Sequence, residues 1–124
     1  MKIIHTDAGR SVGGERLDCS VRAVAIALQV PYALAHEKLR ALGRQDGCVL
    51  YHCSSVFMDG LGLIQRPDLS CRTVANALGD MATGRFIVRV YAHVFAVVDG
   101  FIHDLPGGCP SPRTNVEMVY EVPA

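Results

Sequence analysis

The chain has 124 residues, half of them hydrophobic and 19% charged, a length and composition that fit one folded domain over residues 1–124 and exclude a disordered chain. Its twelve basic and twelve acidic residues cancel, so charge indicates neither a nucleic-acid partner nor an anionic membrane. The N-terminus lacks the apolar run of a secretory signal, and five cysteines without paired spacing fit a reducing compartment, so we expect a cytoplasmic protein.

The predicted elements begin with a short strand or arm at residues 2–5 and a polar, glycine-rich loop up to residue 18. A helix follows from Cys19 to Val30, with Asp18 placed to cap its start and Pro31 to stop its end. Its apolar residues recur at helical spacing: Val21, Val24, Ala25 and Leu28.

Three further helices are expected before the strands. Pro31 opens a second helix that Gly43 ends, which makes a helical hairpin with the first. A third, short helix passes through Val56 and Met58, and a fourth covers residues 73–78. The second helix shares one apolar face among Tyr32, Ala35, Leu39 and Leu42.

The pattern changes after Gly84 to four β-rich runs, at residues 86–90, 93–98, 101–105 and 118–122. Asp99-Gly100 between two apolar runs is a strong hairpin signal, so the second and third runs are predicted to be antiparallel. Helices first and strands later predict an α+β domain, with N-terminal helices packed on one face of a C-terminal antiparallel sheet.

Cys19 is the first candidate for chemistry. The first turn of a helix carries partial positive charge, which lowers the pKa of a thiol there, most effectively beside an imidazole. The alternative is that Cys19 is a small apolar residue at a helix start.

His93 is the first residue of an apolar strand, where a histidine is either packed in the core or directed at a reacting group as a general base. With Asp99-Gly100 as a two-residue turn, Phe95 lies opposite Asp104, which places Asp104 about one diagonal pair from His93. A carboxylate there can hold one imidazole nitrogen while the other nitrogen faces a thiol. The hairpin register therefore predicts a site formed by these two residues and Cys19.

Other polar residues near these positions are expected to have structural or surface roles. Asp99 is the competing carboxylate, but Asp before Gly is what a type I′ turn requires. His103 faces the opposite side of the sheet from Asp104 by strand alternation. Arg22 and Arg44 are expected to be solvated, although either can line a cleft.

Two segments carry a resemblance to a known family: DCSVRAVAIAL at 18–28 and GRFIVRVYAHVFAVVDGFIHD at 84–104. They resemble papain-like cysteine peptidases, especially small phage-encoded ones. The resemblance implies a papain-like fold, with Cys19 as nucleophile, His93 as base and Asp104 as the orienting group. It also implies a cysteine peptidase or isopeptidase that forms a thioester intermediate, needs no cofactor and acts on a peptide or protein, with a host protein as one possible partner.

The chain departs from that family before the cysteine, where papain-like peptidases commonly place a glutamine that helps to stabilise the oxyanion. Residues 11–16 contain neither Gln nor Asn, so the Cys19 N–H and an N–H of the Gly13-Gly14 loop are the expected donors. This departure leaves open a second function, a catalytically silent papain-like binding protein, such as a phage factor that engages a host protein.

A metal site is the third alternative. It would use Cys48, His52 and Cys53, with Cys71 or His103 as a further ligand. Structural zinc sites usually show paired ligand spacings such as C-x2-C, and this chain has no matching second pair. We therefore expect no metal, and we expect the cysteines of the helical part to be packing residues.

Overall fold

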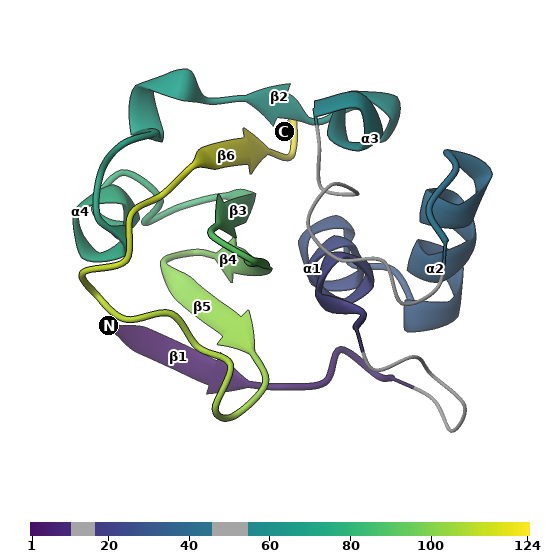
Figure 1. Ribbon diagram of the computed structural model, residues 1–124, viewed down its shortest axis with the longest axis horizontal. Coiled ribbons are helices and arrows are strands. Elements are labelled where there is room, and N and C mark those ends of the chain that lie inside the picture. The colour runs from purple at the N-terminus through teal and green to yellow at the C-terminus, as the bar shows by residue number, and fades with distance from the viewer. Residues whose placement is uncertain (11–16, 46–54) are drawn as a thin grey trace.

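The protein is described here from a computed structural model, which describes residues 1–10, 17–45 and 55–124 (Figure 1). Its central feature is a six-stranded sheet with the strand order β1-β5-β4-β3-β6-β2. The strands are β1 (Lys2–His5), β2 (Ile64–Gln65), β3 (Arg85–Val90), β4 (His93–Val98), β5 (Phe101–Asp104) and β6 (Met118–Glu121). The helices are α1 (Cys19–Leu28), α2 (Tyr32–Ala41), α3 (Ser55–Gly60), α4 (Val74–Leu78) and the 3-10 helix η2 (Pro67–Leu69).

Helix α1 begins at Cys19, as predicted, and ends at Leu28, two residues before the predicted Val30. The helix stops because Gln29 adopts the left-handed conformation, with φ of 56°. The Val30 N–H then turns back and donates to the Ala25 carbonyl at 3.0 Å. This tight ending lets α2 follow almost at once and lie alongside α1.

Helix α2 starts after Pro31, whose φ of −59° suits the residue before a helix. The prediction of a second helix is confirmed, but one member of its predicted apolar face is wrong. Leu42 lies beyond the last helical residue and is 37% exposed. The buried face of the helix consists of Tyr32, Ala35 and Leu39.

The two short predicted helices are also present. Helix α3 runs through Val56 and Met58 to Gly60. Helix α4 begins after Thr73, whose hydroxyl accepts a hydrogen bond from the Asn76 N–H at 3.2 Å and so caps the first turn. Strand β2 was not predicted, because two residues are too few to show an alternating pattern.

The hairpin between β4 and β5 has the predicted register. Val98 pairs with Phe101, and the ladder continues to Ala96 and His103. Asp99 and Gly100 have φ values of 49° and 83°, the pair of positive angles that a type I′ turn needs. Asp99 is therefore a turn residue, and its carboxylate accepts the Gly84 N–H at 2.9 Å.

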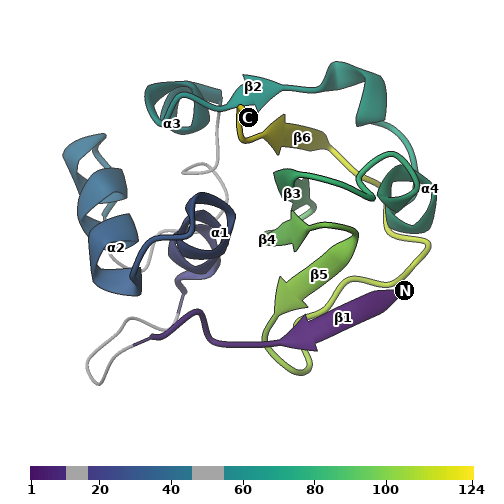
Figure 2. The ribbon, with the colours of Figure 1, turned by 180° about the vertical axis from the view of Figure 1, so that it is seen from behind.

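The α+β class is confirmed, and strands β3 to β6 pair antiparallel as expected, but the whole sheet and its helices differ from the prediction in two respects. Strand β1 pairs with β5 in parallel, so the sheet is mixed. Helices cover both faces: Figures 1 and 2 show α1 and α2 on one side of the sheet and α4 on the other. The sequence predicted helices that precede the strands, but their order does not decide which face each one covers.

Two apolar clusters fill the spaces between these layers. The first joins α1 and α2 to one face of the sheet, and the second joins α4 to the other face. Alternation along β4 explains the division, because Val94 and Ala96 belong to the first cluster, whereas Phe95 and Val97 belong to the second. None of the helices in the described ranges is long and apolar enough to cross a membrane.

Candidate active site

The three predicted site residues lie at the ends of three elements. Cys19 is the first residue of α1, His93 is the first residue of β4, and Asp104 is the last residue of β5. Because β4 and β5 are antiparallel, the start of one and the end of the other lie at the same end of the sheet. Helix α1 packs against β4 and brings its own first turn to this end.

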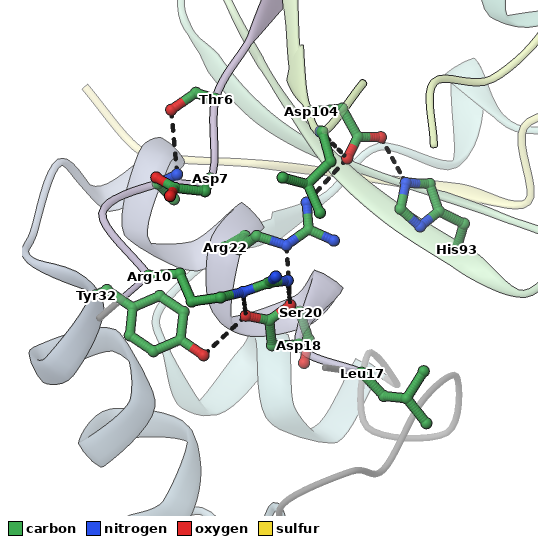
Figure 3. Close-up of polar contacts among 12 residues, drawn as sticks. Thr6, Asp7, Arg10, Leu17, Asp18, Ser20, Arg22, Tyr32, His93 and Asp104 are labelled. Atoms are coloured by element: carbon green, nitrogen blue, oxygen red, sulfur yellow. Dashed lines mark hydrogen bonds and ion pairs between the residues drawn. The ribbon is translucent and has the colours of Figure 1, made fainter. Parts of the chain in front are cut away.

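The structure brings His93 and Asp104 into direct contact. His93 Nε2 lies 2.5 Å from Asp104 Oδ2, and the imidazole stacks on Phe95 with ring centroids 6.1 Å apart. Asp104 is 1% exposed, and its Oδ1 accepts the Leu105 N–H at 2.8 Å. The carboxylate is thus oriented by both β5 and the residue that follows it (Figure 3).

Cys19 lies within interaction range of the same imidazole. It is a free thiol, 6% exposed, and its interactions with His93 and with the Val94 N–H lower its pKa. Since His93 Nε2 faces Asp104, Nδ1 is the ring nitrogen available to the sulfur. A thiol that interacts with an imidazole, which in turn contacts a carboxylate, is the combination that a nucleophile, a base and its orienting group require.

The electrostatics of the site favour a thiolate beside an imidazolium. Burial by itself raises the pKa of Cys19, but the His93 hydrogen bond and charge, the Val94 N–H and the Arg22 charge together lower the pKa below 9.0. Burial by itself lowers the pKa of His93, but hydrogen bonds and charge from Asp104 and Cys19 raise the pKa from 6.5 to about 9. Both pKa shifts favour the imidazolium–thiolate form of the pair over the neutral form.

Asp104 stays ionised although it is buried. Its burial raises the pKa, but His93, Arg22 and the Leu105 N–H together lower it by more than burial raises it, so that the net pKa lies below 3.8. At neutral pH the group next to the imidazole is a carboxylate, as an orienting group must be to stabilise an imidazolium.

A second buried carboxylate lies one residue before the nucleophile. The position of Asp18 before α1 is as predicted, and its carbonyl accepts the Arg22 N–H at 2.9 Å, but its side chain does not cap the helix. Instead, Arg10 Nε donates to Asp18 Oδ2 at 2.7 Å and the Tyr32 hydroxyl donates to the same oxygen at 2.8 Å. These hydrogen bonds and one from Arg22 outweigh burial and lower the Asp18 pKa.

Two arginines that were expected to be solvated are buried. Arg22 is 6% exposed and pairs with both Asp18 and Asp104. Arg44 is likewise buried, with Nε 2.8 Å from Ser20 Oγ and a terminal nitrogen 3.0 Å from the Leu17 carbonyl. The expectation was wrong because a charged residue in a single sequence is assigned to the surface unless its partners are known.

Comparison with protein-family models, curated proteins and solved structures finds no match. The papain-like resemblance therefore depends on the two quoted segments, and the chemistry must be argued from the geometry of the site.

The structure says less about the other predicted residues, which are the second oxyanion donor and the ligands of the metal alternative. The Gly13-Gly14 donor lies outside the described residues, as do Cys48, His52 and Cys53 of the metal alternative. In the parts of the chain that the structure describes, three or more metal-ligating side chains do not cluster. Cys71 is exposed, so its expected role as a packing residue is wrong.

Arg22 is the site residue that sequence reasoning missed, although a signal for it existed. It follows Asp18 by four positions and Cys19 by three, and residues at these spacings share a helix face. An aspartate and an arginine at i and i+4 beside a candidate nucleophile indicate a paired, inward-facing arginine. Arg10 and Tyr32 had no comparable signal, because tertiary structure alone brings them to Asp18.

Proposed function

We propose that this protein is a cysteine hydrolase of the papain-like kind, which cleaves a peptide or isopeptide bond in a peptide or protein substrate. The observation that carries the proposal is that the His93 imidazole contacts the Asp104 carboxylate, with Nε2 2.5 Å from Oδ2, and also interacts with the Cys19 thiol. The resemblance of the segments at 18–28 and 84–104 to papain-like peptidases gives the same three residues the same roles.

In the proposed reaction the Cys19 thiolate attacks the substrate carbonyl carbon and forms a C–S bond, while the carbonyl electrons move to oxygen. The tetrahedral intermediate collapses, the C–N bond breaks, and imidazolium His93 gives its proton to the leaving amine. Water then attacks the thioester, His93 takes a proton from that water, and the C–S bond breaks. The products are a carboxylic acid and a regenerated thiolate-imidazolium pair.

Oxyanion stabilisation in this scheme falls to backbone donors. The Cys19 N–H at the start of α1 is one donor, since the first N–H groups of a helix have no partner within the helix. Loss of one oxyanion donor typically costs about 100- to 1000-fold in turnover, so the absence of the family's glutamine predicts a slow enzyme.

The test is the pH dependence of alkylation of Cys19 by iodoacetamide, followed by mass spectrometry of the proteolytic peptides, which separates Cys19 from the other four cysteines. Because Cys19 is only 6% exposed, restricted access slows its labelling at every pH, but the pH at which the rate reaches half its maximum reports the thiol pKa. Exposed Cys71 provides a comparison thiol in the same tube. We expect the Cys19 midpoint to lie clearly below the Cys71 midpoint, and His93→Gln to remove the difference.

A low Cys19 midpoint should be accompanied by slow release of amine from a mixture of fluorogenic peptides, and Cys19→Ser should abolish this release. If the Cys19 midpoint equals or exceeds that of Cys71, the hydrolase proposal fails.

The small exposed area of Cys19 favours one alternative, a papain-like binding protein without turnover. That protein would keep the fold and bind a protein partner, and it would release no amine even if its thiol midpoint is low. Amine release therefore distinguishes the two functions.

A further inference from the structure

Arg22 bridges the two buried carboxylates of the site. Its Nε donates to Asp18 Oδ1 at 3.0 Å, and one terminal nitrogen donates to Asp104 Oδ1 at 2.9 Å (Figure 3). The side chains of both aspartates are almost completely buried, and that of Arg22 is 8% exposed. Water therefore screens these contacts weakly, and each charge depends on the others for compensation.

The contacts of Asp104 show what the bridge does to the carboxylate. Oδ2 faces His93, whereas Oδ1 accepts from Arg22 and from the Leu105 N–H. Rotation about the bond to the carboxylate would break one of these contacts. The Thr6 N–H also donates to the Asp104 backbone carbonyl at 2.9 Å, so the residue that follows β1 holds the main chain here.

Arg22 is in turn held from its other side. Asp18, which accepts its Nε, also accepts hydrogen bonds from Arg10 and Tyr32. The plane of the guanidinium is therefore fixed by a carboxylate that cannot move without breaking hydrogen bonds to three residues. A planar fork with donors in fixed directions can transmit this constraint, whereas a flexible ammonium group cannot.

We propose that Arg22 is a positioning residue, which fixes the Asp104 carboxylate against His93 and thereby sets the protonation of the Cys19–His93 pair. The inference rests on the hydrolase proposal, because it assigns Arg22 to the same site. Arg22 acts on the pair through Asp104, to which it donates, and through its charge. The alternative is a buried ion pair that only stabilises the packing of α1 on β5.

Several charged or titratable groups besides Arg22 bear on the pair, and any pH readout includes them. His93 and Asp104 come from the sheet, and Asp18 from the turn before α1. The thiol of Cys109 lies close enough to Asp104 for its charge to raise the Cys109 pKa, after burial, which raises it most. Three more groups of the described residues reach the pair through these: Arg10 and Tyr32 contact Asp18, and His5 contacts Cys109.

The experiment compares Arg22→Gln with Arg22→Lys. The first removes the charge and the fork, whereas the second keeps the charge but not the fork. For Arg22→Gln we expect the alkylation midpoint of Cys19 to rise by about one pH unit, which lowers the labelling rate below the midpoint about tenfold. For Arg22→Lys we expect partial recovery of the midpoint, since only the charge is restored.

The second readout is the proton between His93 and Asp104, which gives a downfield proton NMR signal when the hydrogen bond is short. We expect the signal in the wild-type protein, and a loss or upfield move in both Arg22 variants. Arg85→Lys is the matched control, because Arg85 also ties α1 to the sheet, through the Ala27 carbonyl at the far end of the helix. It should lower the melting temperature without moving the signal or the midpoint.

The outcomes separate the two proposals. An ordinary Cys19 midpoint in the wild-type protein would refute the hydrolase function itself. A low wild-type midpoint that both Arg22 variants retain, with the downfield signal unchanged, refutes the positioning role and leaves a structural ion pair. If either Arg22 variant fails to fold, Asp18→Asn weakens the anchor while leaving Arg22 and Asp104 in place, and the positioning role requires the same shift in signal and midpoint.

Discussion

Replacement of Asp104 by asparagine removes the negative charge that faces His93 while keeping nearly the same side-chain shape. Two groups hold the proton on His93 against the effect of burial, Asp104 and Cys19, and Asp104 makes the larger contribution. Without it, burial is opposed only by Cys19. We therefore expect the His93 pKa to fall from about 9 to 6.5 or below in Asp104→Asn.

The size of the effect follows from the raised pKa. A change from about 9 to 6.5 corresponds to about 3 kcal/mol of stabilisation of the imidazolium, at about 1.4 kcal/mol for each pH unit. A neutral imidazole no longer stabilises the Cys19 thiolate, so the thiol pKa returns to an ordinary or higher value. A thiol with a pKa of about 8.5 is roughly 3% ionised at pH 7, which predicts a loss of up to about 30-fold in the alkylation rate.

The assay is an NMR titration of the His93 ring, together with alkylation of Cys19 over the same pH range. Asp68→Asn is the control, since Asp68 pairs with Arg66 away from the three site residues, and it should leave both curves unchanged. If His93 in Asp104→Asn still titrates near 9, the carboxylate is not what holds its proton. The electrostatic reasoning about the site would then be refuted.

Two other predictions concern stability. In the wild-type protein the raised pKa of His93 makes stability fall with pH, whereas the lowered pKa of Cys19 makes it rise, so the two partly cancel and the free energy of unfolding should depend weakly on pH. In Cys19→Ala no lowered thiol pKa opposes the raised His93 pKa, which Asp104 alone now keeps above 6.5 and which lies below the wild-type value of about 9. The stabilisation is complete below pH 6.5 and is lost as the pH rises through this pKa, by less than about 3 kcal/mol in urea titrations, and a flat curve would contradict this. Gly100→Ala should lower the free energy of unfolding by about 1 kcal/mol, because the φ of Gly100 is 83°. Gly108→Ala is the control and should cost less, because the φ of Gly108 lies outside the left-handed region. Equal losses of melting temperature in the two variants would contradict this.

The parts of the fold that sequence predicted well are those that depend on local chemistry. The Asp99-Gly100 turn fixes its hairpin register by backbone conformation alone, and counting residues back from that turn is enough to place Asp104 near His93. Strand β1 and the face covered by α4 depend instead on contacts between distant segments. Lys2 pairs with Phe101, a residue near the other end of the chain, and no local pattern indicates that pairing.

The candidate site divides in the same way. Cys19 at a helix start and His93 at a strand start could be found from periodicity, because each position follows from the ends of a single element. The role of Asp18 could not be predicted in this way. Its position before a helix predicts a cap, but the carboxylate contacts Arg10 and Tyr32, which reach it from other parts of the chain.

The spacing of Asp18, Cys19 and Arg22 has a mechanical consequence. All three belong to the first turn of α1 or to the residue before it, so the nucleophile and the arginine that contacts Asp104 move as one unit. A shift of α1 along β4 would change the distance from sulfur to imidazole and the contact from guanidinium to carboxylate together. Because a buried charge that loses its partner is strongly destabilising, the ion pair opposes the same displacement that would separate the thiol from His93.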